Sequence, residues 1–203
     1  MQLDPGELTP GAMYRFMISA IVPRPIAFVA TMDEQGATNV APFSYFAPLA
    51  SRPPLLGISI NHHRGGGPKD TLRNARATGG FVVHIVHEPL LEAMVRASGE
   101  WPSDASEFAL TGLTAVAAER VRAPRVAEAK LAFECRLERE VALGGTTLVI
   151  GEIVLAHAAD DVMRDGLVDA TLLHPIGRLG GDAYTIVREV VREPRPVVPE
   201  PPR

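Results

Sequence analysis

The sequence predicts a mainly β fold with inserted helices, and three observations lead to that class. Six runs of apolar and β-branched residues have the length of β-strands. Short polar or glycine-rich segments at 33–36 and 143–145 separate two pairs of these runs, as in β-hairpins. Three other segments carry helix signals, with proline near the first turn or glycine after the last one. Periodicity alone therefore predicts an α+β class in which strands dominate.

The first predicted element is a helix over residues 9–20. Pro10 stands in its first turn, where proline is favoured because its missing N–H has no helical partner. Met13, Phe16 and Met17 recur at helical spacing on one face. We expect these three side chains to pack inward.

The later elements follow from turn and breaker residues. The polar turn at 33–36 ends in glycine, so the strands beside it are expected to form a hairpin, with the third strand pairing next. Gly79-Gly80 is expected to end the helix that starts near Lys69. Residues 98–126 are expected to be irregular. The predicted strands cover 26–32, 37–44, 54–60, 81–86, 132–141 and 146–157, and the two later helices cover 69–78 and 89–97.

The composition indicates one compact domain with a distinct tail. The chain has 203 residues, of which 46% are hydrophobic and 22% charged, enough to bury a single sizeable core. We therefore expect one domain over residues 1–191. Residues 192–203 contain five prolines, so this segment is expected to be extended or disordered, either draped over a partner subunit or frayed.

Charge and cysteine content exclude several classes of function. A formal net charge of −4 argues against a nucleic-acid partner or an anionic membrane surface. No apolar run approaches the roughly 18 residues that a membrane span needs. The single Cys135 cannot form an internal disulfide and lies in a strand-like run, where a buried thiol is expected. This cysteine usage favours a cytoplasmic location.

Two segments have the residue types of a cofactor site. Asn39-Val40-Ala41-Pro42-Phe43-Ser44-Tyr45-Phe46 offers an apolar wall with amide, hydroxyl and backbone N–H groups beside it. Lys69-Asp70-Thr71 places a cation at a helix start, where Asp70 or Thr71 can act as the cap and free N–H groups can bind an anion. Residues 64–76 carry four basic side chains and one acidic one, and a solvated helix face would explain that run equally well. Together the two segments suit a flat aromatic cofactor that carries a phosphate.

The order and spacing of these motifs resemble the flavin reductase-like FMN-binding split-barrel family, over about residues 14–184. The resemblance rests on Arg24-Pro25-Ile26-Ala27 and the segment 39–46, then on Lys69-Asp70-Thr71-Leu72-Arg73-Asn74, and finally on Arg178-Leu179-Gly180-Gly181-Asp182-Ala183-Tyr184. One position departs from the family. Where relatives often read Gly-Glu-Phe-Val-Val-Asn, this chain has Gly79-Gly80-Phe81-Val82-Val83-His84.

The resemblance implies a six-stranded antiparallel split β-barrel that forms a homodimer and binds flavin between its subunits. Arg24 and Arg178 are expected to reach the flavin or its phosphate, with a structural surface ion pair as the alternative, and Tyr184 can either cover the cofactor or pack in the core. The cofactor-binding residues that the resemblance implies are Arg24, Thr31, Asn39, Val40, Ala41, Pro42, Phe43, Ser44, Lys69, Asp70, Thr71, Arg178 and Tyr184.

The implied activity is that of an NAD(P)H-dependent flavin reductase. Bound FMN would accept a hydride from NADH or NADPH, and the electrons would pass to free flavin or another small-molecule acceptor. Hydride transfer is direct, so no catalytic acid, base or nucleophile is expected. A flavoprotein oxygenase, a small FMN electron carrier and a non-catalytic flavin-binding module remain as alternatives.

Other chemistries lack their residue patterns. His84 and His87 are three apart in a strand-like run and are expected on opposite faces, so no metal site is predicted. Gly65-Gly66-Gly67 lacks the spacing of a nucleoside-triphosphate loop. The serines near the first motif lack the context of a hydrolase nucleophile.

Overall fold

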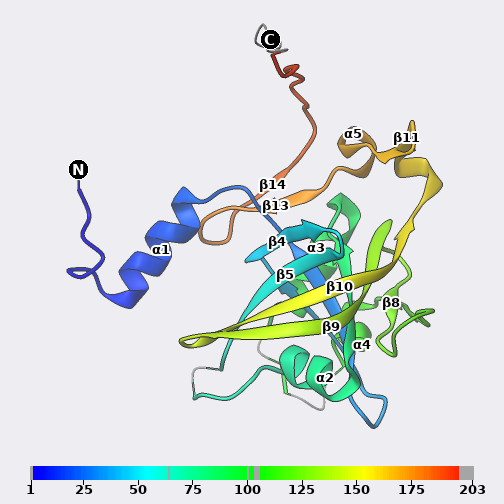
Figure 1. Cartoon of the computed structure of the whole chain (residues 1–203), viewed down its shortest axis with the longest axis horizontal. Helices are drawn as coiled ribbons and strands as arrows, with labels where there is room; N and C mark the ends of the chain where they lie inside the picture. Colours follow the sequence, from blue (N-terminus) through cyan, green and yellow to red (C-terminus); the bar gives the residue numbers. More distant parts are fainter. Residues whose placement is uncertain (1, 64, 100, 103–105, 197–203) are drawn as a thin grey trace, which may run out of the picture.

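The computed structural model describes residues 2–63, 65–99, 101–102 and 106–196, and its largest feature is a seven-stranded antiparallel sheet (Figure 1). The strand order is β3-β2-β6-β9-β10-β5-β4. All six predicted strands are present, and β4 is an edge strand that was not predicted. The strand bounds are β2 (Ala27–Met32), β3 (Thr38–Phe43), β4 (Phe46–Ser51), β5 (Pro54–Asn61), β6 (Gly80–Ile85), β9 (Leu131–Leu143) and β10 (Thr146–Ala158).

The pairing of β5 differs from the expectation that this strand follows the first hairpin in the sheet. It pairs with β4 and β10 instead. The unpredicted strand β4 lies between β3 and β5 in the chain and pairs with β5, which places β3 and β4 at the two ends of the strand order. Pro48 interrupts β4 at a register shift, as expected for proline on an edge strand.

The central strands are buried on both faces because their side chains alternate between two apolar clusters. Phe28 and Ala30 of β2 belong to one cluster with Val82 of β6. Val29 of β2 belongs to the other cluster with Phe81 of β6. This arrangement explains why β2 and β6 read as continuous apolar runs rather than as alternating ones.

Local turn chemistry fixes both predicted hairpins. In the first turn, Asp33 Oδ1 accepts hydrogen bonds from the N–H groups of Gln35 at 2.9 Å and Ala37 at 2.8 Å. Gly36 and Gly144, one in each turn, have φ angles of +94° and +61°, which suit glycine. The pairing of β2 with β3 and of β9 with β10 confirms the two hairpins.

The two predicted helices in the middle of the chain are confirmed, and short elements lie in the segment expected to be irregular. Gly79 has a φ of +70° and ends α2 in the left-handed conformation. The helix α4 and the two-residue strands β7 and β8 lie within 98–126. The bounds are α2 (Asp70–Thr78), the 3-10 turn η1 (Glu88–Leu90), α3 (Leu91–Ala97), α4 (Glu107–Thr111), β7 (Ala115–Val116), β8 (Arg125–Val126), the 3-10 turn η2 (Asp160–Val162) and α5 (Ala170–Leu173).

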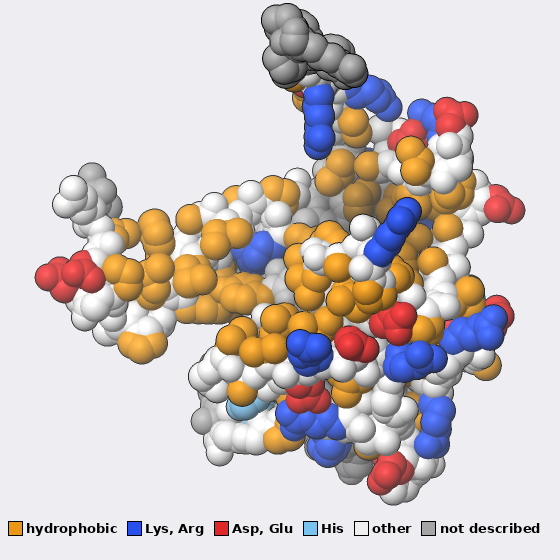
Figure 2. All heavy atoms as spheres, viewed as in Figure 1, with side chains coloured by type: hydrophobic (Ala, Val, Ile, Leu, Met, Phe, Trp, Pro, Cys, Tyr) orange, Lys and Arg blue, Asp and Glu red, His pale blue; other side chains and the backbone are white. Residues whose placement is uncertain are grey.

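Helix α1 (Pro10–Ala20) forms as predicted, but the expected inward packing is wrong. Thr9 caps the helix by accepting a hydrogen bond from Ala12 N–H at 3.2 Å. No residue of α1 is buried, and Phe16 is 46% exposed. The helix projects from the body of the protein, and apolar side chains lie along its visible surface (Figures 1 and 2). The apolar spacing of α1 therefore does not serve the core of this chain.

A small second sheet brings the two ends of the domain together. Strand β13 (Ile176–Arg178) pairs with both β1 (Arg24–Pro25) and β14 (Tyr184–Ile186). Two further strands, β11 (Met163–Arg164) and β12 (Leu167–Val168), form a separate pair. Residues 192–196 of the predicted tail are exposed and have no regular structure, and 197–203 lie outside the described residues. No helix within the described ranges is long and apolar enough to cross a membrane.

Candidate functional site

A cavity of about 450 Å³ lies where α1, the end of β3, α3 and the small sheet meet. Its lining combines apolar and aromatic side chains with two arginines and two serines, a mixture that can hold and orient a small molecule. Half of its lining residues were predicted from the sequence, namely Arg24, Pro42, Phe43, Ser44, Arg178 and Tyr184. The others are Tyr14, Ile18, Ile26, Met94, Ser98 and Gly181.

Arg24 is a buried clamp in this cavity wall rather than an exposed cation. Its side chain donates hydrogen bonds to the carbonyls of Ile18 at 2.7 Å and Ile21 at 2.9 Å, both at the end of α1. It also donates to the Leu179 carbonyl at 3.1 Å and to Ser44 Oγ at 3.4 Å. Four of the five N–H groups of a guanidinium are thus committed to protein acceptors. Arg24 therefore ties α1, the small sheet and the end of β3 together.

Arg178 and Tyr184 form a stacked pair across β13 and β14. The Arg178 guanidinium carbon lies 4.5 Å from the centre of the Tyr184 ring, within the range of a cation–π interaction. The same guanidinium donates hydrogen bonds to the Tyr184 hydroxyl and to the Gly181 carbonyl. The pair places a positive charge and an aromatic ring on one wall of the cavity.

The backbone of β3 offers fewer outward donors than the sequence suggested. Pro42 has no N–H and lies opposite Phe28 in the ladder with β2, so this is a non-hydrogen-bonded pair. The N–H groups of Ala41 and Phe43 consequently point toward β2. Ser44, which follows the strand, remains as the polar residue at this end of β3.

The buried polar residues Thr31, Asn39, Thr71 and Asn74 tie the start of α2 to the sheet. Asn39 Nδ2 donates to Thr71 Oγ1, and Asn74 Nδ2 donates to Thr31 Oγ1, both at 3.3 Å. Asn74 Oδ1 is buried and has no partner among the described residues. Side chains on two strands therefore hold α2 in place.

The N-terminus of α2 is open to an anion. The expected cap at Asp70 or Thr71 is wrong, since the N-cap is Lys69, which forms no side-chain cap hydrogen bond. Asp70 pairs with Arg73 at 2.6 Å. The hydrogen bond from Arg73 N–H to Lys69 O begins the helical ladder, so the N–H groups of Asp70, Thr71 and Leu72 lie at the free end. Exposed Lys69 and these N–H groups have the chemistry of a phosphate site.

One carboxyl group lies close to this helix start. Burial raises the pKa of Glu107, a hydrogen bond from Val40 N–H opposes that rise, and the charge of Asp70 adds to it.

His84 is structural. Its side chain is fully buried, with Nδ1 2.9 Å from Phe28 O and Nε2 2.9 Å from Val126 N. Because Val126 N–H can only donate, Nε2 is the acceptor and Nδ1–H donates to the carbonyl. Burial lowers the pKa of His84 to about 4. His84 thus remains neutral near pH 7 and joins β2 to β8.

The described residues contain no group of three or more potential metal ligands. The cavity residues that sequence reasoning missed come from α1 and α3, namely Tyr14, Ile18, Met94 and Ser98. Tyr14 and Ile18 are four residues apart and so share a helix face, but nothing in the sequence indicates that this face meets the end of β3.

The comparisons with known proteins agree with this fold. Residues 18–174 match the model of the flavin reductase like domain. An uncharacterized Halalkalibacterium halodurans protein is 40% identical over 204 residues, covering 98% of each chain. Nitrilotriacetate monooxygenase component B from Bacillus cereus has a TM-score of 0.92 and 36% identity, covering 95% of this chain and 98% of that one. Pseudomonas fluorescens 2-nitrobenzoate 2-nitroreductase has a TM-score of 0.89 and 30% identity, covering 98% and 99%.

The architecture matches the expected class as well. A Shewanella frigidimarina protein described as a flavin reductase with a split barrel domain has a TM-score of 0.84 and 29% identity, covering 97% of this chain and all of that one. The mainly β fold with inserted helices is thereby confirmed as a split barrel, while the largest sheet has seven strands rather than six. With a matching domain over most of its length, the chain belongs to the flavin reductase-like family.

Proposed function

We propose that the protein binds FMN along β3 and acts as an NAD(P)H-dependent flavin reductase. The observation that carries this proposal is the layout of β3, which has the cationic start of α2 beside Asn39 and the cavity beside Ser44. At about 3.4 Å per residue, the five steps between these residues span roughly 17 Å. That length suits an extended flavin mononucleotide.

The residues divide into two groups along that path. Lys69 and the free N–H groups of α2 would bind the phosphate, with Asp70 and Thr71 in the same turn. Pro42, Phe43 and Ser44 would contact the flavin ring, with Arg178 and Tyr184 lining the same cavity. The positions of β3 and α2 relative to each other would be fixed by Thr31, Asn39, Val40 and Ala41. Arg24 would position Ser44.

The cavity suits hydride transfer without a protein acid or base. Bound flavin supplies the two-electron chemistry, taking a hydride from a nicotinamide and later giving up its electrons. Among the residues that the structure describes, the lining of the cavity contains no Asp, Glu or His. The apolar side chains of its lining, Ile26, Phe43 and Met94, would shield the ring from water, and the charge of Arg178 would stabilise negative charge that develops nearby. This composition favours direct transfer over proton-relay chemistry.

We further propose that the functional unit is a homodimer. Tyr14 and Phe16 are 50% and 46% exposed on a helix that buries none of its own residues. An apolar surface of this kind on a projecting helix is typical of an interface. A second copy of the chain would cover α1 and close the cavity that Tyr14 and Ile18 line. We expect a dimer by light scattering at micromolar concentration, and a Phe16→Glu variant that is folded but monomeric.

Visible spectroscopy of the purified protein tests the reductase proposal. We expect a flavin spectrum after addition of FMN, and bleaching of that spectrum when NADH or NADPH is added without oxygen. Binding without bleaching would indicate an electron carrier. Absence of any flavin binding would leave a non-catalytic module and refute the proposal.

A further inference from the structure

We propose that a second cavity, at the C-terminal end of α2, is an anion site for a linear polyphosphate group. This cavity has a volume of about 600 Å³ and shares no lining residue with the cavity beside β3. Three arginines line it, Arg120, Arg122 and Arg136, together with one acid, Glu119. This is a local excess of positive charge on a chain whose formal net charge is −4. The inference does not depend on flavin binding.

The three guanidinium groups have N–H donors to spare. Arg136 forms an ion pair with Glu152 at 3.7 Å, a distance too long for a hydrogen bond, so the pair does not occupy its N–H donors. Arg122 makes one long hydrogen bond, at 3.4 Å, to the Glu34 carbonyl. Arg120 forms no side-chain hydrogen bond or ion pair with any described residue. Guanidinium groups with free N–H donors bind phosphate oxygens in pairs, with more directional specificity than an ammonium group.

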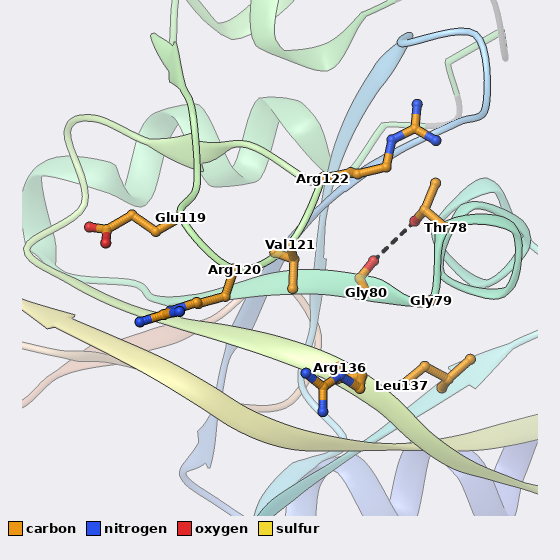
Figure 3. Close-up of a pocket in the computed structure, with 9 residues that line it drawn as sticks. All are labelled: Thr78, Gly79, Gly80, Glu119, Arg120, Val121, Arg122, Arg136 and Leu137. Atoms are coloured by element: carbon orange, nitrogen blue, oxygen red, sulfur yellow. Dashed lines mark hydrogen bonds between the residues drawn. The ribbon is translucent and has the colours of Figure 1, made fainter.

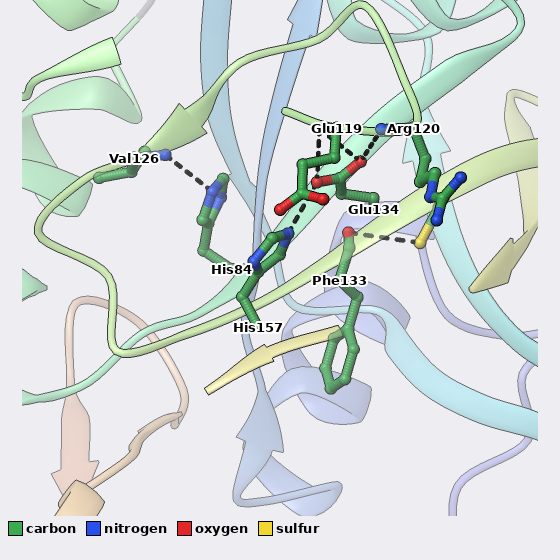
Figure 4. Close-up of polar contacts among 8 residues, drawn as sticks. His84, Glu119, Arg120, Val126, Phe133, Glu134 and His157 are labelled. Carbon is green, nitrogen blue, oxygen red and sulfur yellow. Dashed lines mark hydrogen bonds and ion pairs between the residues drawn. The ribbon is translucent and has the colours of Figure 1, made fainter. Parts of the chain in front are cut away.

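The backbone that carries two of these arginines is held rigidly from below (Figure 4). Glu134 on β9 is fully buried, and its carboxylate accepts hydrogen bonds from Glu119 N–H at 3.0 Å and Arg120 N–H at 2.6 Å. His157 Nε2 lies 2.7 Å from the same carboxylate. Burial acts to raise the pKa of Glu134, but these hydrogen bonds outweigh burial and lower it. Glu134 is therefore an ionised anchor for the loop.

Close packing adds a second constraint on the loop. A Cβ atom added to Gly80 would lie 3.0 Å from Val121 Cγ1, so the loop rests directly on the backbone of β6. Anchoring of Glu119 and Arg120 by Glu134 and packing of Val121 on Gly80 fix the loop before any ligand arrives. Preorganisation of this kind lowers the entropic cost of binding.

The arrangement of the arginines indicates the shape of the ligand. In Figure 3, Arg120 and Arg122 extend to opposite sides of their loop, and Arg136 lies on the neighbouring strand beside Leu137. Side chains that diverge in this way favour a ligand with several anionic groups over a single phosphate. A chain of phosphates can contact them in succession, so affinity should increase with the length of the chain.

Isothermal titration with inorganic phosphate, pyrophosphate and tripolyphosphate at low salt tests the proposal. The protein would carry Lys69→Ala and Thr71→Ala, so that the start of α2 does not contribute. We expect affinity to rise from phosphate to tripolyphosphate, and Arg120→Ala or Arg136→Ala each to weaken tripolyphosphate binding about tenfold, the loss expected for a charge-assisted hydrogen bond. Arg139→Ala is the matched control, because it removes an exposed positive charge from the same strand but does not line the cavity.

Three outcomes would overturn the proposal. The first is no measurable binding of tripolyphosphate. The second is equal weakening by Arg136→Ala and Arg139→Ala, which would mean general electrostatic attraction. The third is no increase with chain length, which would mean that the arginines do not act together. Circular dichroism of each variant separates loss of binding from loss of folding.

Discussion

Replacing His84 with glutamine should remove part of the acid sensitivity of the fold. The imidazole is fully buried and held neutral, with its Nδ1–H bonded to Phe28 O and its Nε2 accepting from Val126 N–H. A glutamine amide also has a donor and an acceptor, but it does not titrate. The His84→Gln variant therefore separates the titration of this side chain from its hydrogen bonds.

The magnitude follows from the pKa of His84, which burial lowers from its ordinary value of 6.5 to about 4. Between these values the unfolded chain binds a proton that the folded protein does not. The stabilisation is thus fully present above pH 6.5 and is lost as the pH falls toward 4. At about 1.4 kcal/mol per pH unit, the full effect is about 3 kcal/mol, and about 2 kcal/mol of it is lost between pH 7.5 and pH 5.

Urea denaturation at pH 7.5 and pH 5 measures this effect. The free energy of unfolding should fall by about 2 kcal/mol less in His84→Gln than in the wild type over this interval. His63→Asn is the control, because His63 is exposed on a loop. Burial also lowers the pKa of His87. Its contribution to the pH dependence of unfolding is the same in the wild type and in His84→Gln, so it cancels in the comparison. Equal pH dependence in the wild type and His84→Gln would refute the assignment of a buried, neutral His84.

Two further substitutions test the structural assignments beside the two cavities. Arg24→Met should lower the free energy of unfolding, measured by urea denaturation, by about 3 kcal/mol, because three carbonyls and Ser44 lose their charged donor. A change below about 0.5 kcal/mol would argue against a structural role for the Arg24 hydrogen bonds. Glu134→Gln should lower the thermal midpoint, because the amide carries no charge and its NH₂ group would face the N–H of Glu119 in either orientation; unchanged melting would contradict an ionised anchor at this position.

The fold could be predicted in outline because local signals and tertiary structure agree in most elements. Asp33 and Gly36 form the first turn, and the hydrogen bonds of Asp33 join residues only a few positions apart in the chain. A turn of this kind can be predicted from the sequence because its signals are local. Strand β4 was missed because Phe46–Ser51 contains alanine and proline and is almost wholly exposed, so neither apolar alternation nor strand propensity marks it.

Contacts between segments far apart in the chain account for the features that the sequence did not predict. The spacing of Phe16 correctly indicated a helix with an apolar face, but periodicity cannot tell whether that face packs in the core or lies on the surface. The sequence did not indicate that the Arg24 guanidinium also donates hydrogen bonds to backbone carbonyls, one of them 155 residues away. No local pattern encodes that partner. The anchoring of the 119–122 loop by Glu134 is equally remote from anything that residue spacing reveals.

The measurement that tests the central claim most directly is a comparison of FMN and riboflavin binding by the wild type and by Lys69→Ala/Thr71→Ala. If the phosphate lies at the start of α2, the double variant should bind FMN about ten- to a hundredfold more weakly, because it loses a charge-assisted contact. Riboflavin, which has no phosphate, should bind both proteins within about threefold, since its ring contacts are unchanged. Equal weakening of both ligands, or no change for FMN, would contradict the placement of the cofactor along β3.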